Sequence, residues 1–268
     1  MKTSRGAVAM KGFKNKAIYT ILFLLILVPS PMYAGNQAIS VEIGSGKALV
    51  VLLEGSATRI KKKMTAAEPL SKGDFLSVGD RVETGKNSRI ELKLPDGSYA
   101  RYDEATTFEL ISAGFDTSQK QRDINISMIM GKTWAKVARL FGRRGNFSIS
   151  TRTAVAGVRG TIYRLNVNED NSVTVKVYWG EVLVNRQTSA QPAVQPGMTQ
   201  PTPVAGPHPV PGPHPVSMEE WTYIVGALQQ IDIRPDGTAT KPFRFNIQED
   251  LNDWVRWNQQ RDKAIGDI

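Results

Sequence analysis

Apolar and polar residues alternate with a period of two through the middle of the chain. The stretch RIELKL at 89–94 places its isoleucine and two leucines on one face, and Glu91 and Lys93 on the other. Such alternation predicts a strand with one buried face and one face in water. PDGS at 95–98 carries the proline and glycine of a tight turn, and YARY follows at 99–102. We therefore expect a β-hairpin here.

Short runs of β-branched and aromatic residues continue on both sides of this hairpin, separated by turn-forming stretches such as NEDNS at 168–172. One run, GKTWAKVARLF at 131–141, fits either a strand or a short helix. Many short strands with turns between them predict an all-β sandwich or roll over residues 45–187. The other expected strands are 108–115, 124–130, 161–167 and 173–179.

The composition changes sharply after this region. Residues 188–216 are rich in Pro, Gln, Thr and Ala and contain GPHPVP followed by GPHPVS. Such a composition is typical of an extended linker, so we expect two units that move independently. His208 and His214 lie in this repeat, and two histidines without carboxylate or cysteine neighbours make a poor metal site.

The pattern beyond the linker predicts a short, mostly helical C-terminal region over 217–268. Ser217 and Glu220 form a capping box before an apolar stripe that runs to residue 230. Asn246 and Glu249 repeat that signal before a second stripe, which contains Trp254. These helices cannot bury their tryptophans alone. They either dock on the β domain or recruit another protein.

Residues 1–34 have the order of a secretory signal peptide. A basic stretch precedes the apolar run AIYTILFLLILV at 17–28, and PSP and MYA then lead to Ala34 and Gly35, between which we expect cleavage. The run would span about 18 Å as a helix, less than the ~30 Å hydrocarbon core. We therefore expect a periplasmic or secreted protein that touches the membrane only through this transient peptide. Met10 is an alternative start, because it shortens the basic stretch.

The charge balance does not point to nucleic acid. The chain has a formal net charge of +9, and more than half of it comes from five basic residues in the first 34 positions. The mature chain is therefore only mildly basic. It contains no cysteine, which excludes disulfides and zinc–thiolate sites.

The usual catalytic constellations are missing from the sequence. Histidine occurs only in the linker, so a histidine-based triad is excluded from the predicted folded part, and no GxSxG or GxxxxGK[ST] motif is present. Asp96, Asp103 and Glu104 lie near the 89–102 hairpin. Paired carboxylates can hydrolyse glycosides when a cleft sets their separation and shifts one pKa. A glycan-active hydrolase stays an alternative to the favoured interpretation, a non-enzymatic protein that needs no cofactor.

Two stretches of the chain resemble the FecR domain. These are GDRVETGKNSRIELKLPDGSYARYDEATTFEL at 79–110 and FSISTRTAVAGVRGTIYRLNV at 147–167, and the likeness covers roughly 70–187. The resemblance implies an all-β periplasmic domain without known enzyme activity. The residues that carry the family motif are Asp96, Gly97, Gly157, Val158, Arg159, Gly160 and Thr161.

The chain also departs from the sensing members of that family. In those members a cytoplasmic segment controls a sigma factor, and a transmembrane helix links it to the periplasmic domain. Here about sixteen residues precede the apolar run, so sigma-factor control does not carry over. We expect a binding, sensing or scaffolding module of the cell envelope, whose ligand is an envelope protein or a cell-wall glycan. A membrane-anchored regulator is the alternative.

Arg159 stands between two glycines of the motif and has two interpretations. In the favoured one, its guanidinium holds the turn to a carboxylate or to backbone carbonyls of the same domain. In the other, it is presented to a partner.

Overall fold

The computed structural model describes residues 43–119, 121–139, 145–187 and 221–266. The expected signal peptide with its Ala34–Gly35 junction, the linker over 188–216, and both histidines lie outside these residues. Within the described part of the chain, no helix is long and apolar enough to cross a membrane.

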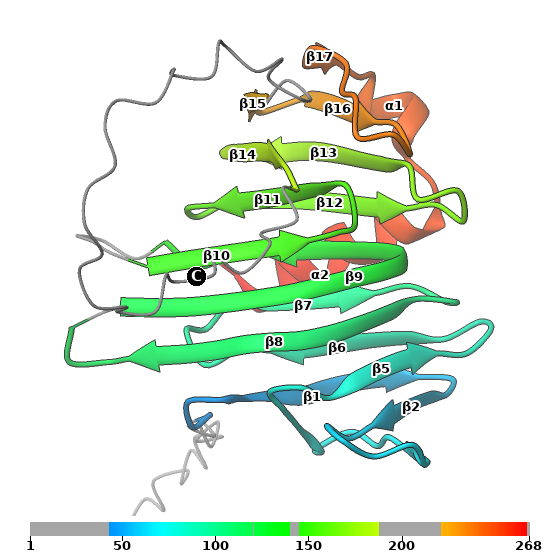
Figure 1. Ribbon diagram of the computed structural model, residues 1–268, viewed down its shortest axis with the longest axis vertical. Helices are drawn as coiled ribbons and strands as arrows, with labels where there is room; N and C mark the ends of the chain where they lie inside the picture. The colour runs from blue at the N-terminus through cyan, green and yellow to red at the C-terminus, as the bar shows by residue number, and fades with distance from the viewer. Residues whose placement is uncertain (1–42, 120, 140–144, 188–220, 267–268) are drawn as a thin grey trace, which may run out of the picture. The chain divides into compact units, whose positions relative to one another are not determined.

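The described residues form two facing β-sheets, as the sequence predicts (Figure 1). All neighbouring strands are antiparallel except β9 and β10. Sheet A contains, in spatial order, β4 (Phe75–Ser77), β1 (Lys47–Glu54), β6 (Arg89–Lys93), β7 (Tyr99–Tyr102), part of β9 (Gln121–Lys136), β12 (Ile162–Val167), β13 (Val173–Trp179), β16 (Gln229–Ile233) and β17 (Phe243–Arg244). Sheet B contains β3 (Ala67–Pro69), β2 (Ala57–Ile60), β5 (Arg81–Thr84), β8 (Thr107–Asp116), the rest of β9, β10 (Gly145–Ser150), β11 (Ala154–Val158), β14 (Glu181–Arg186) and β15 (Thr222–Gly226).

The long strand β9 joins the two sheets. Its first part pairs with β8 in sheet B up to Met130, and its second part pairs with β12 in sheet A from Gly131. Gly131 has φ +101°, and a Cβ there would lie 2.6 Å from the Cα of Thr106. Only glycine fits this close approach. The ambiguous stretch 131–141 is therefore strand as far as Lys136.

The main core lies between the sheets and follows the predicted alternation. Leu92 from sheet A and Phe108 from sheet B are fully buried, and the ring of Tyr102 stacks on Phe108 with centroids 3.6 Å apart. Glu91, which the alternation places on the opposite face, is also fully buried. That outer face of sheet A is covered by the C-terminal helices.

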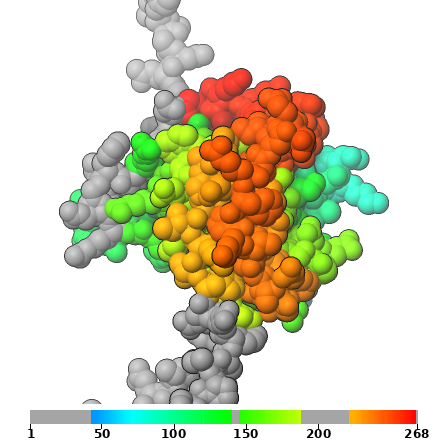
Figure 2. Space-filling model, turned by 90° about the horizontal axis from the view of Figure 1, so that it is seen from above, coloured from blue at the N-terminus to red at the C-terminus, as the bar shows by residue number. Residues whose placement is uncertain are grey.

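The prediction of a helix over 217–230 is wrong. Residues 222–233 form a hairpin of β15 and β16, whose loop contains Leu228 at φ +62°. β15 pairs with β14 in sheet B, and β16 pairs with β13 in sheet A. In Figure 2, which looks at the molecule from above, the hairpin residues, yellow to orange, face the viewer. The chain after the linker thus extends both sheets, so a separately moving helical unit over 217–268 is not what the structure contains.

The second helical signal is confirmed, although it is split in two. Helix α1 spans Ile247–Asp250 with Asn246 as its N-cap, and α2 spans Asp253–Ile265 with Asn252 as its N-cap. The side chain of Asn252 accepts a hydrogen bond from the Val255 N–H at 3.0 Å, which satisfies one of the free donors at a helix start. Both helices lie behind sheet A in Figure 1.

Candidate functional site

Arg159 follows β11 in the turn that leads to β12. The turn needs Gly160, which has φ +69° and whose Cβ would lie 2.4 Å from the Cγ of Arg139. Arg159 itself is exposed, and among the described residues its guanidinium has no hydrogen bond or ion pair. The favoured prediction that it holds the turn together is therefore wrong.

Another arginine, Arg122 on β9, holds this region instead. Its Nη1 donates to Asp96 at 3.0 Å and to the Ala138 carbonyl at 2.8 Å, and its Nη2 donates to the Val158 carbonyl at 3.4 Å. Both charged side chains of the Arg122–Asp96 pair are buried. Arg122 thus joins the hairpin motif to the end of β11, which is why the turn does not need the guanidinium of Arg159.

The other motif residues also have structural positions. Asp96 accepts hydrogen bonds from the backbone N–H and the hydroxyl of Ser98, and Gly97 takes φ +86° in the same turn. Thr161 is buried and donates to the Glu181 carbonyl at 2.9 Å. Most of the motif therefore builds the fold, and Arg159 is its outward-facing charged member.

Arg159 borders a hollow of about 450 Å³ on the outer side of sheet B. The register places Gly157 on β11 beside Leu183 on β14, and Leu183 beside Ile224 on β15. Leu183 is 44% exposed and Ile224 is 63% exposed. We call Arg159, Leu183 and Ile224 the Arg159 surface. It combines a guanidinium with two exposed aliphatic side chains.

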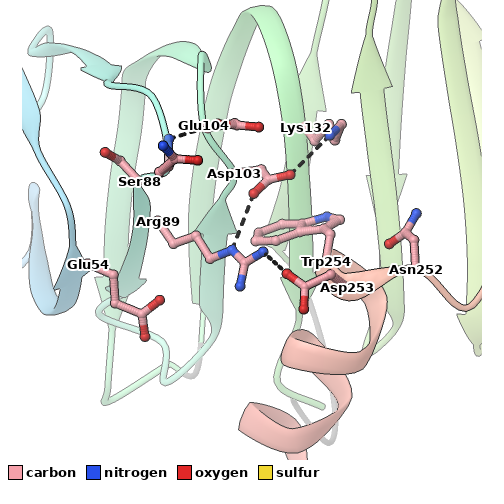
Figure 3. Close-up of a pocket in the computed structure, with 10 residues that line it drawn as sticks. Glu54, Ser88, Arg89, Asp103, Glu104, Lys132, Asn252, Asp253 and Trp254 are labelled. Atoms are coloured by element: carbon pink, nitrogen blue, oxygen red, sulfur yellow. Dashed lines mark hydrogen bonds and ion pairs between the residues drawn. The ribbon is translucent and has the colours of Figure 1, made fainter.

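A second, more polar cavity of about 500 Å³ lies beside the start of α2 (Figure 3). Arg89 crosses it, with its Nε 3.3 Å from Asp103 and its Nη2 2.5 Å from Asp253. Asp103 also accepts from Lys132 at 3.0 Å, and Glu104 accepts from the backbone N–H of Asn87 at 2.7 Å. The carboxylates of this cavity are therefore already engaged by donors of the same chain.

This arrangement does not favour the glycan hydrolase. Of the three carboxylates that the sequence suggested, Asp96 is buried with Arg122, while Asp103 and Glu104 line the cavity. A paired-carboxylate hydrolase needs one acid with a raised pKa. Instead, the hydrogen bond from Arg89 holds the pKa of Asp253 below its usual value. Within the described ranges, no three His, Cys, Asp or Glu side chains are grouped to hold a metal ion.

Comparisons with known proteins give one family match and two similar crystal structures. Residues 80–183 match the family described as FecR protein. This match confirms the resemblance to the FecR domain over these residues. No curated protein matches the chain.

Two crystal structures of a candidate anti-sigma factor from Parabacteroides distasonis ATCC 8503 are similar to it. The 1.65 Å structure has a TM-score of 0.44 at 17% identity, and covers 67% of this chain and 64% of its own. The 2.50 Å structure has a TM-score of 0.42 at 17% identity, and covers 63% of this chain and 61% of its own. The chain thus spans less than two thirds of the length of these structures.

Proposed function

We propose that this chain is an exported, non-enzymatic regulatory module of the bacterial cell envelope, and that it acts by binding a protein partner at the Arg159 surface. Three features support the proposal. They are the match to the FecR domain, the signal-peptide order of residues 1–34, and the carboxylates of the polar cavity beside α2, which accept hydrogen bonds from donors of the same chain.

The observation that carries the proposal is that Arg159 is exposed and has no hydrogen bond or ion pair within the part of the chain that the structure describes. An arginine in a tight turn is most often held by neighbouring acceptors, but here Arg122 makes those contacts. Glu181 lines the same hollow as Arg159, and among the described residues no ion pair joins the two side chains. The guanidinium fork is thus free to take a carboxylate or carbonyls of a partner in two parallel hydrogen bonds.

The chemistry of the surface favours a protein over a glycan. Leu183 and Ile224 are aliphatic, so they suit apolar side chains, whereas sugars prefer the flat face of an aromatic ring. Trp179 is partly exposed, but the Arg139 guanidinium already lies over its ring, 4.2 Å from the centroid. We therefore propose a partner that presents a carboxylate beside apolar side chains.

A site-specific cross-link inside the cell tests this function. A photo-reactive phenylalanine analogue at position 183 should give one defined cross-linked protein species after illumination. Adding Arg159→Ala should reduce that species at least tenfold without lowering the amount of folded protein. Arg152→Ala is the matched control, because Arg152 is another exposed arginine of the same motif region.

Two results would contradict the proposal. One is a cross-linking pattern that Arg159→Ala leaves unchanged. The other is a cross-linked species that Arg152→Ala removes as effectively, because the effect would then reflect general charge rather than this surface.

A further inference from the structure

The C-terminal segment, residues 246–266, is held on the outer face of sheet A by charged groups and by an apolar cluster. Near its start, Asp250 accepts from Arg164 at 2.6 Å, from Lys176 at 2.7 Å and from the Tyr178 hydroxyl at 2.5 Å. The three donors project from neighbouring strands β12 and β13. One carboxylate thus fastens α1 to the sheet.

A second set of contacts fastens the far end of α2. Asp262 accepts from Arg101 at 2.7 Å and from the indole N–H of Trp134 at 3.0 Å. In the opposite direction, Arg261 of the helix donates to Glu91 of the sheet at 2.7 Å. The segment is therefore held at both ends by charge-assisted hydrogen bonds, which depend on geometry more than apolar contacts do.

The apolar part of this attachment is a cluster separate from the main core, with Ile162, Tyr178, Leu251 and Trp257 at its edge. Trp134 of the sheet packs with Trp254 and Val255 of the helix, while the main core fills the space between the two sheets. Interfaces that form and dissociate are more polar than a domain core. The attachment of residues 246–266 has that mixed composition, with an apolar cluster in the middle and charge-assisted hydrogen bonds at both ends.

Removal of the segment would leave the face with an excess of positive charge. The groups that contact the segment include more cations than acids. The cations are Arg89, Arg101, Lys136, Arg164 and Lys176, and the acids are Glu54 and Glu91. Buried cations are unfavourable without a counter-charge. A replacement must therefore bring carboxylates to the positions that Asp250 and Asp262 occupy.

We propose that the outer face of sheet A is a binding surface for an acidic helix of a protein partner, and that residues 246–266 are the occupant which such a helix displaces. This surface is distinct from the Arg159 surface on sheet B, so the inference does not depend on the proposed function. The partner helix is recognised by two carboxylates, one for the Arg164–Lys176 pair and one for Arg101, with an apolar stripe between them.

A peptide of residues 244–268 with a fluorescent label is the probe for this exchange. It is added to the full chain carrying Asp250→Asn and Asp262→Asn, in which the chain's own segment is weakened. Fluorescence anisotropy should show saturable binding at least tenfold tighter than to the unmodified chain. The same peptide carrying both Asn substitutions should bind the weakened chain at least tenfold less tightly. Lys263→Gln in the full chain is the matched control, because Lys263 is an exposed charge on the same helix, and it should bind the peptide as the unmodified chain does.

Absence of peptide binding to the weakened chain, when circular dichroism shows its sheets intact, would overturn the proposal. If the chain carrying Asp250→Asn and Asp262→Asn does not fold, amide hydrogen exchange of the unmodified chain tests the proposal instead. Backbone amides of 253–265 should then exchange as one unit at least tenfold faster than those of β7 and β12. If the amides of the helix and of these strands exchange at the same rate, the segment opens only when the whole fold unfolds. That result would overturn the proposed displacement by a partner helix.

Discussion

Arg101 on β7 and Glu91 on β6 form an ion pair at 2.5 Å in which both side chains are fully buried, although they point away from the main core. The pair is buried because α2 lies over it, with Arg261 adding a second donor to Glu91. Sheet A is therefore covered on both faces, by sheet B on one side and by the C-terminal segment on the other.

Replacing Glu91 should be strongly destabilising. Glu91→Ala leaves Arg101 as a buried charge without its nearest counter-charge, so we expect a loss of about 3–5 kcal/mol in the free energy of unfolding. Urea unfolding measures this loss. Glu83→Ala, at an exposed position on β5, is the control and should lie within about 0.5 kcal/mol of the unmodified protein. Equal effects of the two substitutions would contradict the buried network.

Replacing Arg122 should destabilise the fold around the FecR motif residues. Arg122→Ala removes the partner of buried Asp96 and the donor to two carbonyls. A loss of about 3–5 kcal/mol is therefore expected. Arg122→Lys should restore only part of it, because an ammonium group cannot reproduce the planar fork. Full recovery with lysine in thermal unfolding would show that charge alone matters at this position.

Acid should weaken the attachment of the C-terminal segment. Burial alone would raise the pKa of Asp250, but Lys176, Tyr178 and Arg164 together hold that pKa below its usual value. A carboxyl with a lowered folded-state pKa stabilises the fold above its unfolded pKa of about 4, and that contribution is lost as the pH falls through the folded value. We therefore expect the free energy of unfolding to decrease as the pH drops below about 4.

Urea unfolding from pH 6 down to pH 2 measures this dependence. Asp250→Asn should be less stable near pH 6 and should lose less stability in acid than the unmodified chain. Parallel pH profiles for the two proteins would contradict the assignment to Asp250.

Export should remove the first 34 residues. The basic, apolar and small-residue order ends at Ala34, so N-terminal sequencing of the periplasmic protein should begin at Gly35. A full-length protein found only in washed membranes would instead support the membrane-anchored alternative.

Local chemistry made the hairpin at 89–102 predictable from the sequence. The period of two, the PDGS turn and the following YARY lie within fourteen residues, and the structure pairs β6 with β7 as expected. The same pattern could not show that Glu91 is buried. Its cover comes from a helix 170 positions away in the chain, and no local signal reports such a contact.

The stretch 217–230 shows the opposite case, in which a local signal was overruled. The capping box at Ser217 and the apolar stripe favour a helix, but β14 and β13 offer free edges at which residues 222–233 complete both sheets. The run of Thr222, Tyr223, Ile224 and Val225 also suits a strand. Edge pairing in the folded protein decided the outcome, as it often does for short amphipathic segments.

Of the Arg159 surface, the sequence singled out only Arg159, and Leu183 and Ile224 were not predicted. The motif drew attention to the turn at Arg159, and the likeness to FecR domains marked Asp96 as well. Whether Arg159 holds the turn or is exposed depended on Arg122, which is distant in sequence from both Arg159 and Asp96. A charged residue at an inward position of a strand, as in QRDINIS at 121–127, was the signal that could have revealed it.

The central claim is that Arg159 is available for binding because it does not hold the fold. The most direct test is urea unfolding of Arg159→Ala beside the unmodified chain. We predict that the two free energies of unfolding agree within about 0.5 kcal/mol, as for other exposed side chains. A loss of about 2 kcal/mol or more would show that the guanidinium holds the β11–β12 turn after all, and would contradict the account.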